Sequence, residues 1–292
     1  MATTYLLVTV AVFFWAANFV LAGPVLADLP PLWAASLRFL LGATLMIAIA
    51  GFRREDLKGL LSRHAGIYLL LGTVGIAAFN LFFFYALRIT SAANAALIMA
   101  TNPLLTTLLA FALLGEKPTM RHLAALPVAL AGVAVVISGG SMGRLASFSV
   151  SRGDLLMLAA NASWALYNVL GKKYMPKGSA LGNTSLVMAA GAAILFGVAM
   201  ASGAHMGELG VRAAMALAVM AVGGTVFAYL FWSMGIMRLG AARTAIFINL
   251  VPVFALLIEG ALGTSPTAAQ LAGGFLVLCG VSISILPVLR TA

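Results

Sequence analysis

Residues 79–83, Phe79-Asn80-Leu81-Phe82-Phe83, are matched 149 positions later by Ala228-Tyr229-Leu230-Phe231-Trp232. A slightly shorter interval, 148 residues, later separates Gly132 from Gly280. Matches at a nearly fixed interval indicate a tandem duplication, and we assign the repeats to residues 1–140 and 150–292. The 149-residue interval also separates identical residues on both sides of the opening stretch: Trp15 and Trp164, Gly75 and Gly224, and Pro103 and Pro252.

The composition is that of a membrane protein. Hydrophobic residues make up 63% of the chain and charged residues 8%, with a mean hydropathy of +1.11, whereas soluble domains carry about 25% charged residues. Apolar runs of about 20 residues cross a bilayer as helices. We therefore predict an all-α membrane protein with ten transmembrane helices, five in each repeat. The predicted spans are 4–22, 31–51, 65–87, 91–115, 121–139, 153–171, 181–202, 212–237, 241–262 and 268–289.

The placement of basic residues predicts the orientation of these spans. If the N-terminus is cytoplasmic, twelve of the 17 Lys and Arg residues fall in cytoplasmic segments, four fall outside, and Arg38 lies within the second span. Cytoplasmic loops carry the excess of Lys and Arg, so both termini are predicted to be cytoplasmic. The net charge of +10 is explained by this bias and by anionic lipid headgroups. No basic cluster with interleaved aromatic residues indicates nucleic-acid binding.

An odd number of spans in each repeat means that the second repeat is inverted relative to the first. Inverted-repeat membrane proteins bind solutes near the bilayer midplane, where the two halves meet and rock against each other. The loops are too short for an enzyme domain. The chain has no paired carboxylates, serine dyad or His-Glu-x-x-His pattern at membrane depth, so the sequence predicts no enzyme activity, metal or cofactor.

Polar residues deep in the first and sixth predicted spans are candidates for the lining of a cavity. Trp15 and Trp164 lie near the bilayer centre rather than at an interface, where Trp is usually enriched. Asn18 and Asn168 share their respective helix faces, and Tyr167 is the repeat counterpart of Asn18. These residues would line a cavity or, alternatively, form hydrogen bonds between helices.

The stretch quoted at the start supplies further candidates, namely Phe79, Asn80, Phe83 and Tyr229. Two helices rich in aromatic residues would face each other across the pseudo-symmetry axis. The aromatic side chains would form either the wall of a binding site or ordinary helix packing. Asn80 and Tyr229 occupy equivalent positions in the two repeats but differ in type, so we expect these positions to contact the polar groups of the substrate.

Two prolines predict symmetric distortions of the fourth and ninth spans. Pro103 and Pro252 each remove a backbone donor and clash with the carbonyl four residues earlier, so each helix should kink. Kinks of this kind in inverted repeats point to a binding region or a hinge, although a purely structural kink is the alternative. The polar residues near them, Thr101, Asn102 and Asn249, are added to the candidate cavity.

Few charged residues fall inside the predicted spans, and Arg38 and Glu259 are the candidates among them for a functional role. They could serve in gating or proton coupling, or form a stabilising ion pair near the outer surface. The middle of every span lacks a carboxylate. This absence argues against a central carboxylate relay and favours a neutral or zwitterionic solute.

Several short motifs in the first repeat have a characteristic order. They are Trp15-x-x-Asn18, Arg38-Phe39-Leu40-Leu41, Ala92-Ala93-Asn94-Ala95-Ala96 leading to Pro103, and Gly115-Glu116-Lys117-Pro118-Thr119. These motifs resemble the EamA type of the drug/metabolite transporter superfamily, and the resemblance covers both repeats. It implies a cavity lined by spans one to four and six to nine, with spans five and ten peripheral. Within the superfamily, the chain is most similar to the bacterial aromatic amino-acid exporters. The second repeat departs from the motif of the first where Thr264-Ser265 replaces Glu116-Lys117.

Together these features predict an alternating-access carrier in the cytoplasmic membrane of a bacterium. It would export small amphipathic metabolites, with aromatic or other hydrophobic amino acids as the first choice. Amphipathic cations or drugs are the alternative, since aromatic rings also attract cations. A structural or lipid-moving membrane protein is a third interpretation. The expected partners are the small-molecule substrate and membrane lipids, and a monomer would suffice.

Overall fold

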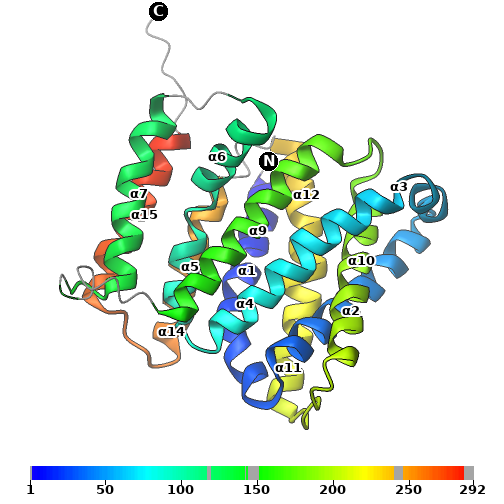
Figure 1. The fold of residues 1–292 in the computed structure, drawn as a ribbon, viewed down its shortest axis with the longest axis horizontal. Coiled ribbons are helices and arrows are strands. Elements are labelled where there is room, and N and C mark those ends of the chain that lie inside the picture. Colours follow the sequence, from blue (N-terminus) through cyan, green and yellow to red (C-terminus); the bar gives the residue numbers. More distant parts are fainter. Residues whose placement is uncertain (1, 117–119, 142, 144–150, 240–245, 286–292) are drawn as a thin grey trace, which may run out of the picture.

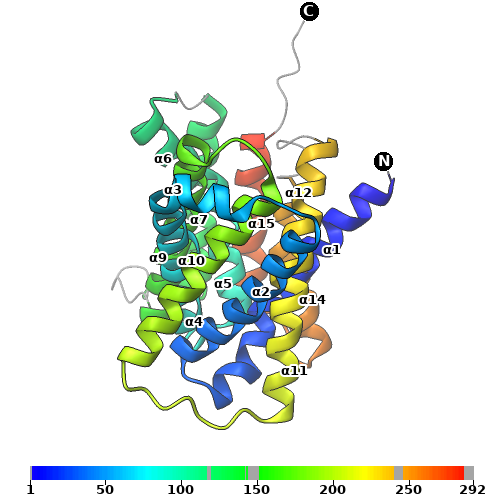
Figure 2. The same ribbon diagram turned by 90° about the vertical axis from the view of Figure 1, so that its right-hand side faces the viewer.

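The computed structural model describes residues 2–116, 120–141, 143, 151–239 and 246–285, and their regular structure is helical throughout (Figures 1 and 2). The first repeat contains α1 (Ala2–Asp28), α2 (Pro31–Phe52), α3 (Leu57–Leu71), the π-helix η1 (Gly72–Ala78), α4 (Phe79–Leu87), α5 (Ala92–Met99), α6 (Asn102–Leu114) and α7 (Met120–Ser138). The second repeat contains α9 (Arg152–Tyr174), α10 (Ala180–Ala201), α11 (Val211–Val219), the π-helix η2 (Met220–Phe227), α12 (Ala228–Leu239), the 3-10 helix η3 (Ile246–Asn249), α14 (Leu250–Ala261) and α15 (Ala268–Ile285).

Six helical stretches are long and apolar enough to cross a membrane, which makes the chain a multi-pass membrane protein. The other predicted spans correspond to α9 and to shorter apolar helices within α7, α14 and α15. The full count of ten spans remains a prediction. The six long stretches are Ala2–Asp28, Pro31–Phe52, Leu57–Leu87, Ala92–Leu114, Ala180–Ala201 and Val211–Trp232.

Helix boundaries follow from local chemistry. Ser91, Ser151 and Ser179 precede α5, α9 and α10, and each side chain accepts a hydrogen bond from a backbone N–H of the first turn. Gly115 ends α6 in a left-handed conformation with φ of 70°, which glycine adopts without a steric penalty. Residues 117–119 of the motif that follows lie outside the described part of the chain.

Each repeat contains a π-helical segment at the same place, which the sequence analysis did not predict. The first, η1, extends from Gly72 to Ala78, and these positions correspond to Ala221 and Phe227 within η2. A π-helix widens the turn and is often found at functional sites. Both segments lie in the helix that contributes the aromatic stretch of its repeat.

Contacts between the repeats occur in reciprocal pairs. A Cβ atom at Gly42 would meet Thr225, and one at Gly191 would meet Ile76. Gly42 and Gly191 are 149 positions apart, and so are Ile76 and Thr225, so the two contacts are equivalent. In the same way, Gly75 lies against Tyr167 and Gly224 lies against Asn18. Exchange of equivalent contacts is the property of two units related by a two-fold axis. The four glycines let the helices approach closely, as small residues do in membranes.

The pair α7 and α15 lies to one side of the remaining helices (Figure 1). At Gly132 an added Cβ would come within 2.6 Å of the Gly273 carbonyl oxygen and 2.7 Å of the Val277 nitrogen. The reciprocal contact joins Gly280 to Ala129, with a distance of 2.7 Å to its nitrogen. The backbones of α7 and α15 are therefore in direct contact, and the small residues that permit this are matched in both repeats.

Equivalent helices of the two repeats run in opposite directions. In Figure 1, α1 runs downward from the N-terminal end, whereas α9 rises from the lower left toward α10. The end of α1 accordingly lies beside the start of α11, where Asp28 Oδ2 accepts a 2.9 Å hydrogen bond from the Gly210 N–H. Both views place the start of α1 and the end of α15 toward the same end of the molecule.

Candidate functional site

A cavity of about 100 Å³ lies between the two repeats. Its wall is drawn from α1, α2, α4, α5, α6, α9, α12, η3 and α14, so both repeats contribute. Among the described residues, α7, α10 and α15 contribute none of the lining. The lining side chains are mainly aromatic and aliphatic: Trp15, Asn18, Phe19, Arg38, Phe39, Phe79, Phe83, Met99, Ala100, Asn102, Trp164, Tyr229, Ile248 and Val251.

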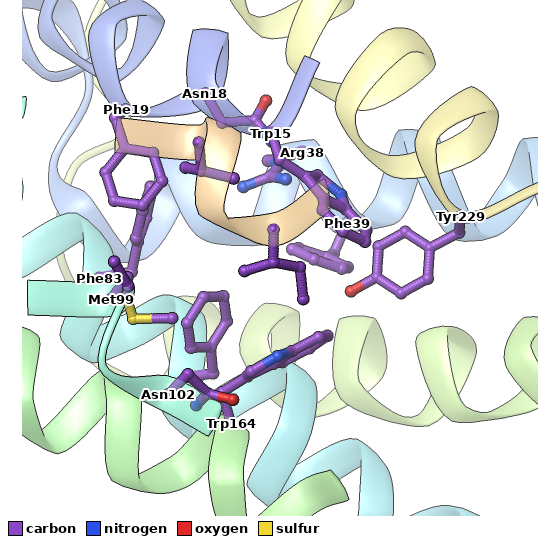
Figure 3. A pocket seen from close by; sticks show the side chains of 14 residues that line it. Trp15, Asn18, Phe19, Arg38, Phe39, Phe83, Met99, Asn102, Trp164 and Tyr229 are labelled. Carbon is purple, nitrogen blue, oxygen red and sulfur yellow. The ribbon is translucent and has the colours of Figure 1, made fainter. Parts of the chain in front are cut away.

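Aromatic rings from the two repeats meet around this cavity (Figure 3). The Trp15 ring lies 5.7 Å from that of Tyr229 and 4.9 Å from that of Trp232, measured between centroids. On the opposite side, Trp164 lies 5.2 Å from Phe79 and 6.4 Å from Tyr229. These spacings are those of favourable aromatic pairs, so the rings support one another and present apolar faces to the cavity.

The π-helix η2 supplies a backbone partner for α1. The Trp15 indole N–H donates to the Gly224 carbonyl oxygen at 3.2 Å, because the buried indole needs an acceptor. Asn18, which is 4% exposed, packs directly on Gly224, and its Oδ1 atom is buried without a hydrogen-bond partner. A buried polar atom without a partner lowers the stability of the fold, so the unpaired oxygen makes Asn18 a candidate for contact with a ligand.

Arg38 lies in the cavity wall and is 5% exposed. Its Nε donates to Thr225 Oγ1 at 3.3 Å, and its Nη1 donates to Asn80 Oδ1 at 3.4 Å. Asn80 is fully buried and is held by a 2.9 Å hydrogen bond from its Nδ2 to the Ile76 carbonyl oxygen. Asn80 therefore lies behind Arg38 and is absent from the cavity lining, although the sequence analysis placed it there.

Glu259 lies away from Arg38, and the two do not form the ion pair considered from the sequence. Its Oε1 accepts a 3.3 Å hydrogen bond from the Ala93 N–H, at the start of α5. It borders a separate hollow that also contains Phe19 and Thr264. The salt bridge found among the described residues joins Lys172 to Glu116, both substantially exposed. The pairing expectation failed because Arg38 points into the cavity and Glu259 toward the start of α5.

Pro103 and Pro252 lie at breaks in the regular α-helix that do not end the helical path of the chain. The first lies in the opening turn of α6, after Ala100 and Thr101, whose backbone stays in the right-handed helical region, so Ala92–Leu114 remains one helical stretch. The second lies in the opening turn of α14, after the 3-10 helix η3. Proline is tolerated in a first turn because the missing N–H has no intrahelical partner there. The backbone of Asn249 ends η3, and its side chain lies outside the described part of the structure.

A polar cluster closes the break between α5 and α6. The Ile98 carbonyl oxygen accepts hydrogen bonds from Thr101 Oγ1 at 2.7 Å and from Asn161 Nδ2 at 3.0 Å. Asn102 Nδ2 donates to Asn161 Oδ1 at 2.7 Å, and Asn168 Nδ2 reaches Asn102 Oδ1 at 3.4 Å. Asn161 was missed in the sequence analysis, although residues 161, 164 and 168 share one face of α9.

Comparison with known sequences decides the family. The model of the EamA-like transporter family matches twice, over residues 2–138 and 151–286. The chain belongs to the EamA-like transporter family. This membership indicates a two-repeat membrane fold and a function in the membrane transport of a small molecule. It also agrees with the superfamily resemblance noted from the motifs.

Several relatives of this EamA-like chain are named as transporters. "Uncharacterized transporter YyaM" of Bacillus subtilis (strain 168) is 37% identical, with 92% of this chain and 88% of that protein covered. A "Probable amino-acid metabolite efflux pump" of Salmonella typhimurium is 29% identical, covering 93% and 91%. A solved crystal structure superposes over 97% of this chain and 96% of its own length, with a TM-score of 0.68 and 21% identity, which supports the fold.

The cavity of this EamA-like protein brings together part of the sequence-predicted site. Trp15, Asn18, Phe79, Phe83, Asn102, Trp164 and Tyr229 all line it, together with Arg38. Thr101 and Asn168 belong instead to the polar cluster at the helix break. Tyr167 packs on Gly75 and on the Trp164 ring behind the wall. The lining residues that the sequence analysis missed, such as Phe19, Phe39 and Met99, are apolar and carry no signal that separates them from helix packing.

Asn161→Leu is expected to destabilise the protein by about 1–2 kcal/mol, because the Asn102 amide and the Ile98 carbonyl lose buried partners. Thermal unfolding in detergent would measure this loss. Asn168→Leu is a matched control on the same helix, since it removes only the 3.4 Å contact, and it should have the smaller effect. Equal unfolding temperatures for the two variants would contradict a structural role for the cluster.

Proposed function

We propose that this protein is an alternating-access carrier that exports small amphipathic metabolites, with aromatic and other hydrophobic amino acids as the main substrates. The observation that carries the proposal is the cavity between the repeats, whose aromatic wall is interrupted by Asn18, Arg38 and Asn102. An aromatic side chain would stack on the rings, and the polar ends of the solute would meet these three residues. Its volume of about 100 Å³ lies below the roughly 300–1,000 Å³ of pockets for drug-sized ligands, which favours a small solute.

We further propose ten spans arranged as two inverted five-helix repeats, with both termini in the cytoplasm of a bacterial cell. The twelve-to-four bias of basic residues supports this orientation. The opposite directions of α1 and α9, and the position of both described ends at one end of the bundle, support the inversion. Reciprocal contacts between the halves provide the symmetric interface on which two rocking units would move.

The names of two relatives agree with amino acids as substrates. One is the Salmonella typhimurium efflux pump described above. The other is a "Probable terminal-alkyne amino-acid exporter" of Streptantibioticus cattleyicolor, 26% identical over 85% of this chain. Export of amphipathic cations fits the cavity less well, because the charged group in its wall is the cation Arg38. Like charges in a site of low dielectric constant repel strongly.

Purified protein in liposomes is expected to transport radiolabelled phenylalanine faster than protein-free liposomes do. Lysine should remain at the background rate, because its second ammonium group would enter an apolar and positively charged cavity. Initial rates of uptake into preloaded liposomes provide the measurement. Equal background rates for phenylalanine and lysine would reject the proposed function.

A further inference from the structure

Arg38 is a charge placed deep inside an apolar protein. It is the eighth residue of α2, which begins at Pro31, and therefore lies about 10 Å along the helix. Its side chain is 5% exposed, and that exposure is to the central cavity. Charged side chains at membrane depth are costly and are usually paired with an opposite charge. A partner for Arg38 is therefore expected.

No Asp or Glu side chain is such a partner. All seven Asp and Glu residues of the chain lie in the described part of the structure, and none of them forms a salt bridge with Arg38. The hydrogen bonds of Arg38 go to the neutral acceptors Thr225 and Asn80, at 3.3 and 3.4 Å. Charge-assisted bonds are shorter, at about 2.7–2.9 Å. A guanidinium carries five N–H donors, so three of them make no hydrogen bond to the described residues. The guanidinium carbon also lies 5.1 Å from the centre of the Phe39 ring, a contact that leaves the charge without a carboxylate.

The repeat symmetry shows that this charge is specific to one side of the cavity. The counterpart of Arg38 is Val187, which is buried in the core and absent from the lining. Figure 3 shows Arg38 beside Asn18 and Trp15 at one side of the cavity, with Trp164 and Asn102 at the other. A ligand with one charged end and one apolar end would thus have a defined orientation.

We propose that Arg38 binds the carboxylate of the transported solute, and that the solute class is aromatic or aliphatic carboxylates, including zwitterionic amino acids, rather than cations. This inference rests on the proposed transport function. The planar guanidinium can hold both oxygens of a carboxylate, while the apolar part of the ligand lies against Trp164 and Phe79. Thr225 and Asn80 keep the guanidinium directed at the cavity.

A structural role for Arg38 makes a different prediction. Through Thr225 and Asn80, Arg38 also joins α2 to η2 and α4. If that tether were its whole role, its removal would lower stability and slow the transport of every ligand alike. A carboxylate site instead changes the apparent affinity only for ligands that carry a carboxylate.

The test is inhibition of phenylalanine counterflow in proteoliposomes by two matched probes. 3-Phenylpropionate keeps the ring and the carboxylate, and 2-phenylethylamine keeps the ring and the ammonium group. The wild type should be inhibited about 10- to 100-fold more strongly by the carboxylate, as expected for charge-assisted hydrogen bonds. Arg38→Gln should raise KM for phenylalanine by a similar factor and abolish this preference.

Two further variants separate the causes. Arg38→Lys keeps the charge and should restore part of the preference, whereas Arg212→Gln removes an exposed arginine at the start of α11 and should leave it unchanged. Equal inhibition of the wild type by the two probes would overturn the assignment, whether or not Arg38→Gln folds. The assignment would also be overturned if folded Arg38→Gln were still inhibited more strongly by 3-phenylpropionate than by 2-phenylethylamine. If the wild type shows no counterflow with phenylalanine, the proposed transport function fails first, and the role of Arg38 fails with it.

Discussion

Gly191→Leu is expected to lower the thermal stability of the protein more than any other single change considered. Gly191 lies on α10, and an added Cβ would collide with Ile76 and come within 2.8 Å of the Gly72 carbonyl oxygen. The helix backbone at η1 cannot yield as a flexible side chain can, so α10 and η1 must separate. Overpacking of this kind costs about 1–3 kcal/mol, and we expect the upper end of this range because backbone atoms are involved; thermal unfolding in detergent would detect the loss.

Gly197→Leu provides the matched control. Gly197 lies on the same helix and has no atom within 4 Å of its added Cβ, so the same substitution there should be nearly neutral. If both leucine variants unfold at the wild-type temperature, the close approach of α10 and η1 does not stabilise the protein. Gly42→Leu tests the reciprocal contact and should also destabilise, because the Cβ would press on Thr225.

Trp164→Ala is expected to reduce phenylalanine transport by about tenfold or more, while the protein stays folded. Trp164 is half-buried and lines the cavity, so the indole would offer a face to the ring of the solute. Loss of one aromatic contact worth about 1.5 kcal/mol corresponds to roughly a tenfold change in affinity. Initial rates in proteoliposomes over a range of phenylalanine concentrations would show a raised KM.

Trp164→Phe serves as the control for this variant, because it keeps an aromatic face and its packing on Phe79. It should retain most of the transport activity. Unchanged flux in Trp164→Ala, with unfolding temperatures like the wild type, would show that the ring only packs against its neighbours. A loss of folded protein in Trp164→Ala would be visible by size-exclusion chromatography and would assign Trp164 to stability instead.

Much of the fold could be predicted because the bilayer imposes strong constraints on sequence. Runs of apolar residues identify the helices, and the 149-residue interval identifies the duplication. The π-helices could not be predicted in this way, since Gly72–Ala78 has the same apolar composition as an α-helix. The prolines indicated a distortion, but not its local form, which is a turn before α6 and a 3-10 segment before α14. The hydrogen bond from Asn161 to the Ile98 carbonyl depends on the packing of α9 against α5.

For the site, the sequence indicated how deep each residue lies in the membrane. It indicated less well the direction in which each side chain points from its helix. Trp15 and Trp164 were selected by depth and both line the cavity. Asn80 was selected from the aromatic stretch at residues 79–83 but faces Arg38 from behind the wall, and Tyr167 turns toward Gly75. The direction of each side chain depends on packing against the other repeat, which a single sequence does not contain.

The reciprocal glycine contacts have a consequence for how such a protein can change. Gly42 and Gly191, and likewise Gly75 and Gly224, are the same residue in both copies, and they hold the halves together. Several positions that line the cavity differ between the copies, with Arg38 in one where Val187 stands in the other, although Trp15 and Trp164 are identical. The two copies have thus kept the same glycines where their helices meet, while the two sides of the cavity have become chemically different.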